Sequence, residues 1–249
     1  MELTEELIYK HVAFDLEIAT PLPEGSDGWT PSLGISCAAT FKSGEDKPRI
    51  WHGSSLGIFP YPERKNTEEC RELAAYLIKC QEEGYPMVTW NGAAFDMRVL
   101  AEECGEEWHG LLKELTMNHI DPGFHMLCIK GYMVGLSTAA QGLRVGDKME
   151  GMHGSLAPTM WAEDRESQDK VLQYVAQDAL LTSKVYVALQ EDRRLDWISR
   201  AGRPQTWAFR EGLLPVNKAN ELSLPDTSWM TSPRLRGDCL QWTENSKTA

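Results

Sequence analysis

The first regular pattern in the chain is an apolar run over residues 12–18, interrupted only by Asp15 and Glu17. Side chains two apart in a strand point to the same face, so a strand here places both carboxylates on one side. Like charges on one face of a buried strand repel and lose hydration, which calls for a cation or a raised pKa. This stretch alone fits an edge strand with a solvated polar face just as well.

The following patterns predict a sheet with helices. Apolar stretches at 33–41 and 48–53 flank a polar turn, and with the first strand they predict an antiparallel meander. A capping residue, an acidic first turn, apolar residues at helical spacing and a closing Gly predict a helix over 67–83. A buried strand over 85–92 and a helix over 93–105 complete an α/β order, typical of a mixed sheet covered by helices.

In the second half we expect helices over 121–130 and 137–143, a Gly-rich loop, and a long helix over 166–192. Residues 195–209 then show a strand, turn, strand pattern, and the rest is interrupted by Pro and has little periodicity.

The length of 249 residues suits one large α/β domain with an appendage. We expect the domain over residues 1–192 and a C-terminal extension over 193–249, a hairpin and a Pro-rich tail, that packs on it. The net charge of -12 disfavours binding of nucleic acid by overall charge, but the extension holds nine of the 25 Lys/Arg and six of the 37 Asp/Glu. An acidic body with a mildly basic tail could bind divalent cations and a polyanion at separate places. A well-solvated surface is the alternative, which we favour for the bulk of the acidic residues.

Three features predict a cytoplasmic protein that does not engage a membrane. The N-terminus is acidic where a signal peptide would be basic, and the apolar runs are too short to span a bilayer. The six cysteines have no paired spacing, which favours reduced structural thiols over disulfides or a zinc site.

Further acids stand where an α/β sheet gathers a site. Asp96 lies near the start of a helix that follows a strand, with Asn91 in the turn between them. Tyr174 and Asp178 are four apart and share a helix face. Taken singly, Asp96 could only complement the helix dipole, and Asp178 could lie on a solvated face.

The segments "FDLE", "NGAAFD" and "YVAQD" stand in the order and spacing of the three exonuclease motifs of the DEDD superfamily of 3'-to-5' exonucleases. The Tyr four residues before the last Asp resembles the DEDDy branch, because the histidine branch would have His where Gln173 stands. Over residues 10–190 the chain looks most like the proofreading domain of family B DNA polymerases, and more distantly like RNase D and the Werner-type exonucleases. Ile18 departs from the pattern, since many relatives carry Thr there.

The resemblance implies an RNase H-like fold and a site with two ions of Mg²⁺ or Mn²⁺, hard cations that prefer oxygen ligands. Asp15, Glu17 and Asp178 would hold the first ion, Asp15 would bridge to the second, and Asp96 would hold the second largely through water. Tyr174 would orient the attacking water. The set implied as catalytic is therefore Asp15, Glu17, Asp96, Tyr174 and Asp178.

Four residues are candidates for substrate contact, and each has a structural alternative. Phe95 and Leu16 could be core residues, and Asn91 could cap a helix. Lys148 could meet a phosphate, although a solvated loop is the explanation that we favour for it.

Two other groups of residues have a simpler structural explanation. His119, Asp121 and His125 could suggest a transition-metal site, but capping by Asp121 ahead of Pro122 explains the spacing better. The arginines and Trp residues of 193–210 suit single-stranded nucleic acid, whereas a hairpin with buried Trp and solvated Arg is the structural alternative, which we favour.

The sequence predicts a metal-dependent 3'-to-5' exonuclease that releases mononucleotides from single-stranded DNA or RNA 3' ends. A non-catalytic RNase H-like binding module and a structure-specific endonuclease are the alternatives. A protein partner could dock on the C-terminal tail.

Overall fold

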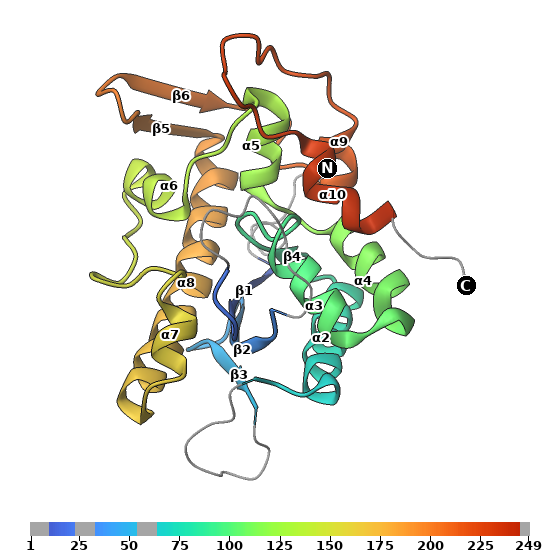
Figure 1. Ribbon diagram of the computed structural model, residues 1–249. Coiled ribbons are helices and arrows are strands. Elements are labelled where there is room, and N and C mark those ends of the chain that lie inside the picture. Colours follow the sequence, from blue (N-terminus) through green and yellow to red (C-terminus); the bar gives the residue numbers. More distant parts are fainter. Residues whose placement is uncertain (1–9, 23–32, 54–63, 245–249) are drawn as a thin grey trace.

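Four strands form a mixed sheet in the order β3-β2-β1-β4 (Figure 1). The structure, a computed structural model, describes three stretches of the chain: residues 10–22, 33–53 and 64–244. β1 (Val12–Ile18) pairs antiparallel with β2 (Ile35–Lys42) and parallel with β4 (Met87–Val88), and β2 pairs antiparallel with β3 (Arg49–His52). The predicted mixed α/β sheet is confirmed. Because β1 is central and almost wholly buried, the alternative of a solvated edge strand is wrong.

The two faces of the sheet are covered by different helices. Phe14 and Leu16 of β1 pack with α2 (Thr67–Glu82) and α3 (Asp96–Cys104), whereas Cys37 and Ala39 of β2 pack with α8 (Arg165–Asp192). Since neighbours along a strand alternate between faces, Asp15 and Glu17 lie on the face of α8. Figure 1 shows α8 on one side of the sheet and α2 to α4 on the other.

The helix expected over 67–83 begins where its capping signal predicts. Asn66 Oδ1 accepts a hydrogen bond from Glu69 N at 3.0 Å, and Glu69 Oε2 accepts one from Asn66 N at 2.8 Å. This reciprocal pair satisfies two backbone donors that a helix N-terminus otherwise leaves unpaired.

The strand expected over 85–92 is shorter than predicted. Beyond Val88 the backbone pairs instead with the segment before α5, since Thr89 N donates to Ile120 O and Ile120 N to Met87 O. A turn over 92–95 then leads into α3.

The remaining helices include four that the sequence reasoning missed, namely α4, α7, α9 and α10. Their bounds and those of the two predicted helices are α4 (Glu106–Asn118), α5 (Pro122–Lys130), α6 (Leu136–Leu143), α7 (Ala157–Trp161), α9 (Val216–Asn220) and α10 (Arg236–Glu244). The last two lie in the Pro-rich tail. Trp242 of α10 enters the core beside α3 and donates from Nε1 to Ala93 O at 3.0 Å, so tertiary packing holds this tail.

The predicted hairpin forms from β5 (Arg194–Ile198) and β6 (Pro204–Ala208). Trp197 and Trp207 are buried against the body, as the structural alternative predicts, while the arginines of this segment are exposed. All six cysteines are buried free thiols. Among the described residues, no helix is long and apolar enough to cross a bilayer. Residues 1–9 and 245–249, which belong to the predicted domain and extension, lie outside the described stretches.

Candidate active site

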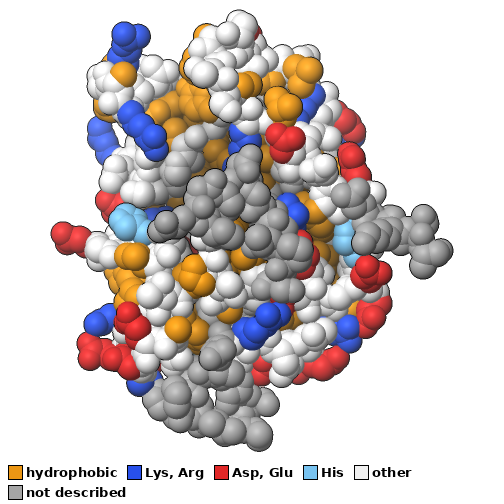
Figure 2. Space-filling view, viewed as in Figure 1, with side chains coloured by type: hydrophobic (Ala, Val, Ile, Leu, Met, Phe, Trp, Pro, Cys, Tyr) orange, Lys and Arg blue, Asp and Glu red, His pale blue; other side chains and the backbone are white. Residues whose placement is uncertain are grey.

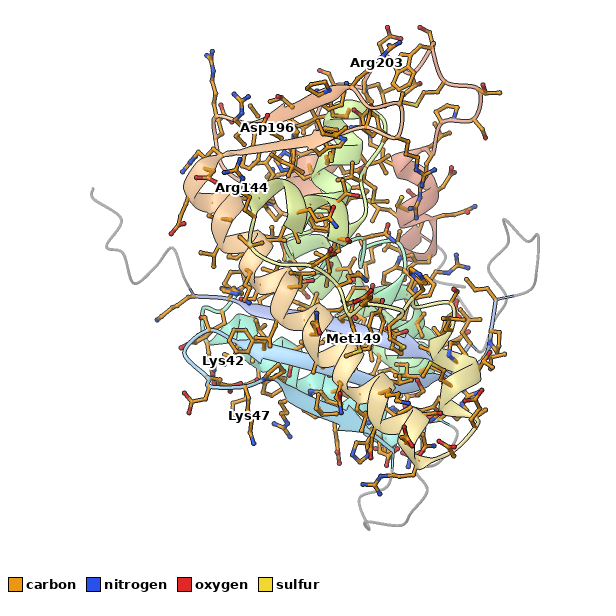
Figure 3. The ribbon with its side chains drawn as sticks, turned by 90° about the vertical axis from the view of Figure 1, so that its left-hand side faces the viewer. Lys42, Lys47, Arg144, Met149, Asp196 and Arg203 are labelled. Carbon is orange, nitrogen blue, oxygen red and sulfur yellow. The ribbon has the colours of Figure 1, made fainter. Side chains whose placement is uncertain are left out.

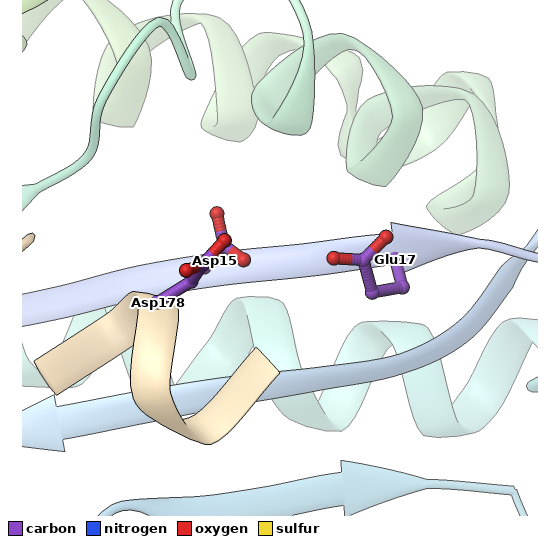
Figure 4. Close-up of side chains that lie close together, drawn as sticks. All are labelled: Asp15, Glu17 and Asp178. Carbon is purple, nitrogen blue, oxygen red and sulfur yellow. The ribbon is translucent and has the colours of Figure 1, made fainter. Parts of the chain in front are cut away.

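Three carboxylates meet between the sheet and α8. One side-chain oxygen each from Asp15, Glu17 and Asp178 lies within 4.8 Å of the others (Figure 4). The first two come from β1 and the third from the middle of α8, so the prediction that Asp15 and Glu17 share a face is confirmed. Among the described residues this is the one group of His, Cys, Asp or Glu side chains spaced to hold a metal ion.

The long helix brings Tyr174 and Asp178 to this place. Asp164 caps α8 by accepting from Ser167 N at 2.8 Å, and the helix then crosses β1 and β2 with both side chains 2% exposed. The alternative of a solvated helix face for Asp178 is therefore wrong.

Asp96 reaches the same region from the opposite layer. As the first residue of α3 it suits the helix dipole, but it is also only 5% exposed, and its Oδ1 accepts from Leu16 N at 3.2 Å. That bond ties the start of α3 to β1 between the two acids. Asp96 does not belong to the three-carboxylate group.

Burial and mutual repulsion disfavour the ionised forms of these acids. Burial raises the pKa of Asp15 well above its usual value, and the charges of Asp178, Asp96 and Glu17 raise it further. The pKa of Glu17 is raised well above its usual value in the same way, first by burial and then by Asp178. Burial also raises the pKa of Asp96, to about 7, although backbone hydrogen bonds partly oppose this. The site is short of positive charge.

Lys148 supplies one positive charge, and its assignment to a solvated loop is wrong. Its Nζ forms an ion pair with Asp178 and donates to Tyr174 Oη at 3.0 Å. Burial alone would lower the pKa of Lys148, but Asp178 and Asp15 outweigh it and raise that pKa. Burial raises the pKa of Tyr174, which keeps the phenol protonated at neutral pH.

A cavity of about 340 Å³ opens over these groups. All nine residues that the sequence reasoning selected line it: Asp15, Leu16, Glu17, Asn91, Phe95, Asp96, Lys148, Tyr174 and Asp178. Ile18, which replaces the usual Thr, lines it as well. The topology thus gathers residues from β1, the turn before α3, the Gly-rich loop and α8 around one space.

The candidate substrate residues differ in their surroundings. Asn91 does not cap α3, because the residue at the cap is Phe95, and Asn91 instead adopts a left-handed backbone with φ 68°. Phe95 is half-buried and both packs on the core and lines the cavity. Leu16 is 4% exposed and belongs to the core cluster, although it also borders the cavity.

Asp121 and Arg234 hold Asn91, which lines the cavity, and the sequence reasoning missed both roles. Asp121 caps α5 as predicted, by accepting from Phe124 N, but it also accepts from Asn91 N at 2.9 Å and Ala93 N at 3.0 Å. Arg234 of the tail donates to Asn91 Oδ1 at 3.0 Å. The Pro after Asp121 signalled only the cap, and no sequence pattern links residues 143 apart.

The neighbouring histidines do not form a metal site with Asp121. His119 hydrogen-bonds through its two ring nitrogens with Thr89 Oγ1 and Thr116 O, and His125 packs edge-on against Trp207. Burial lowers the pKa of both rings, for His125 to about 4, so each is a neutral core side chain.

The three-carboxylate group fits a divalent metal. Its donors are carboxylate oxygens, the ligands that Mg²⁺ and Mn²⁺ prefer. Asp178 Oδ1 is buried and has no hydrogen-bond partner in the described structure, which is a costly arrangement unless a cation satisfies it. A cation would also offset the repulsion that raises the pKa of Asp15 and Glu17.

A family model of the RNase H superfamily matches residues 51–190, more than half of the chain. The match includes Asp96, Tyr174 and Asp178 but begins after β1, so the carboxylates of β1 join the site on structural grounds. No curated protein matched the sequence. The finer resemblance to DEDDy exonucleases stays a prediction, whereas the mixed sheet and the family match agree on the RNase H-like fold. The chain belongs to the RNase H superfamily.

Proposed function

We propose that this protein is a metal-dependent 3'-to-5' exonuclease that hydrolyses phosphodiester bonds at single-stranded DNA or RNA ends and releases nucleoside monophosphates. The observation that carries the proposal is the three-carboxylate group, whose oxygens lie within 4.8 Å of one another in a cavity that Tyr174 also lines. Superfamily members are generally nucleases, which agrees with this chemistry.

The residues would divide the work as follows. Asp15, Glu17 and Asp178 would hold one Mg²⁺ or Mn²⁺, and Asp96 would hold a second with Asp15. When bound, such ions activate water and stabilise the leaving oxygen in an in-line displacement. Tyr174 would orient the attacking water by a hydrogen bond, since a phenol with a raised pKa is a poor base at neutral pH. Lys148 would exchange its contact with Asp178 for one with a substrate phosphate.

The size of the cavity supports action at an end. Ligand pockets range from ~300 to ~1,000 Å³, so about 340 Å³ suits one terminal nucleotide rather than a duplex. Asn91, Phe95 and Leu16 would surround that nucleotide. The half-buried ring of Phe95 would contact the base.

The same proposal has three further parts. The domain ends near residue 192, the protein is cytoplasmic, and a protein partner binds the tail. The six buried free thiols support the location. The tail exposes large apolar side chains that a partner could cover: Leu224, Trp229 and Leu235.

The test is incubation of 5'-labelled single-stranded DNA and RNA with Mn²⁺ or with EDTA. We expect shortening from the 3' end and mononucleotide products, only with Mn²⁺ and not with Asp15→Ala or Asp178→Ala. A circular single strand has no 3' end, so its cleavage would establish an endonuclease instead. Full activity in either variant would refute the site.

A further inference from the structure

A second concave surface lies beside the β5–β6 hairpin, outside the carboxylate cavity. It is a groove of about 570 Å³ between α6 and the hairpin, and its wall includes Arg144, Arg194 and Gln141. The hairpin backbone is packed tightly on α6, because a Cβ added at Gly142 would lie 2.2 Å from Asp196 O. The groove is therefore a fixed feature of the fold.

The charge of this region is opposite to that of the whole protein. Residues 193–210 contain five arginines and one acid, Asp196, in a chain of net charge -12. Asp196 pairs with Arg194. In the part of the chain that the structure describes, no carboxylate lies within salt-bridge distance of Arg144, Arg200 or Arg203. Figure 2 shows Lys and Arg side chains gathered at the hairpin corner of the molecule, with most Asp and Glu side chains elsewhere.

Arg144 carries a conformational cost as the residue whose backbone N–H closes α6. It ends α6 with a left-handed φ of 59°, a position that Gly normally occupies. Gly at this position would relieve the backbone cost and remove only the guanidinium, so the position isolates the side chain of Arg144. Its exposed guanidinium stands at the wall of the groove.

The groove and the carboxylate cavity are linked by one short segment. Arg144 borders the groove and Lys148, four residues later, lines the cavity, so their Cα atoms are at most ~14 Å apart. At ~3.4 Å per stacked nucleotide, no more than about four nucleotides separate the two positions. Asp147, between them, is fixed by Ser137 and by Gln141, whose Nε2 donates to Asp147 Oδ2 at 2.6 Å.

We propose that this groove binds the phosphate backbone of a single strand whose 3' end occupies the carboxylate cavity. Its cations would be Arg144 and Arg194 of the wall and Arg203, the neighbour in sequence of the wall residue Pro204. The inference rests on the proposed function for the direction of the strand. Arg suits this task because its planar fork pairs with phosphate oxygens. Trp197 and Trp207 support the hairpin from below rather than stacking on bases, since both are buried.

The test measures binding without cleavage, in EDTA, by fluorescence anisotropy of a 20-nucleotide single-stranded DNA and RNA. The variant is Arg144→Gly with Arg203→Ala, because Gly suits the backbone at 144 and Arg203 is exposed. The control, Lys47→Ala with Lys113→Ala, removes two exposed cations distant from the groove and leaves the same net charge. Figure 3 shows Arg144 and Arg203 at the hairpin end and Lys47 at the sheet end.

We expect the groove variant to bind about tenfold more weakly, with a salt dependence lower by ~0.7 for each lost phosphate contact, and the control to bind as wild type. The gain in affinity from a 4-mer to a 12-mer should also shrink in the groove variant. Equal affinity of groove variant and control overturns the proposal, as does displacement of the strand by polyglutamate of equal charge. If the groove variant binds more weakly and the wild-type protein releases no mononucleotides, the groove is retained and the exonuclease is rejected.

Discussion

The carboxylate cavity and the β5–β6 hairpin use charge in opposite ways. In the cavity, acids are held on β1, α3 and α8 and are nearly all buried, so their repulsion is part of the folded state. In the hairpin, arginines stand in solvent around buried Trp residues, and their charges cost the fold little. The comparison separates a site whose geometry is fixed by the core from a surface whose charge is free to meet a ligand.

The largest expected effect is on chemistry in the cavity. Asp178→Asn keeps the shape of the side chain but removes a charge that a metal would need, so we expect activity with Mn²⁺ to fall by about 10³-fold. Mononucleotide release measures this. Glu82→Gln, at an exposed acid of α2, is the control and should keep full activity. Comparable losses of activity in both variants would show that activity does not depend specifically on the carboxylates of the cavity.

The next largest effect is on the support of the hairpin. Trp207 is fully buried, and its ring centroid lies 4.6 Å from that of Phe209. Trp207→Ala should therefore lower the free energy of unfolding by about 3–5 kcal/mol. Trp229→Ala is the matched control, because Trp229 is 67% exposed. Its free energy of unfolding should stay within about 0.5 kcal/mol of the wild-type value. Urea denaturation gives both values. A small change for Trp207 would mean that the hairpin is not anchored by its core.

The pH dependence of stability tests the repulsion in the cavity. Asp96 has a raised pKa of about 7 in the folded chain. Without a cation, its contribution to the free energy of unfolding is therefore present at low pH and is lost as pH rises from about 4 through 7. Asp96→Asn does not titrate, so its stability relative to wild type should increase across that window in EDTA. The lowered pKa of His125 makes stability rise with pH. This effect is the same in both proteins, so it cancels when the two are compared. A constant difference between pH 4 and 8 would contradict the assignment.

The smallest expected effect concerns the hairpin surface. Arg203→Ala removes an exposed side chain, so the free energy of unfolding should change by less than about 0.5 kcal/mol. Thermal unfolding in the absence of nucleic acid measures it. A larger loss would assign the arginine to folding and weaken the contrast with the cavity.

The sequence predicted what local patterns encode. Alternation over β1 placed Asp15 and Glu17 on one face, and four-residue spacing placed Tyr174 with Asp178. The capping signals of Asn66 and Asp121 marked helix starts within a residue. These features depend on neighbours in the chain.

Long-range contacts were beyond reach of such patterns. Lys148 sits in a Gly-rich loop with no periodicity, and only the fold shows its contact with Asp178. The helices of the tail have weak patterns because a few anchors such as Trp242 hold them. The groove likewise arises where α6 meets a hairpin more than 50 residues later.

The most direct test of the central claim is titration of Mn²⁺ into the wild-type protein and into Asp178→Asn by calorimetry at pH 8. The account predicts saturable binding to the wild type and a loss of at least tenfold in affinity in the variant, because Asp178 contributes a buried oxygen without another partner. Absence of Mn²⁺ binding to the wild type, or equal binding by both proteins, would contradict the account and favour a non-catalytic RNase H-like module.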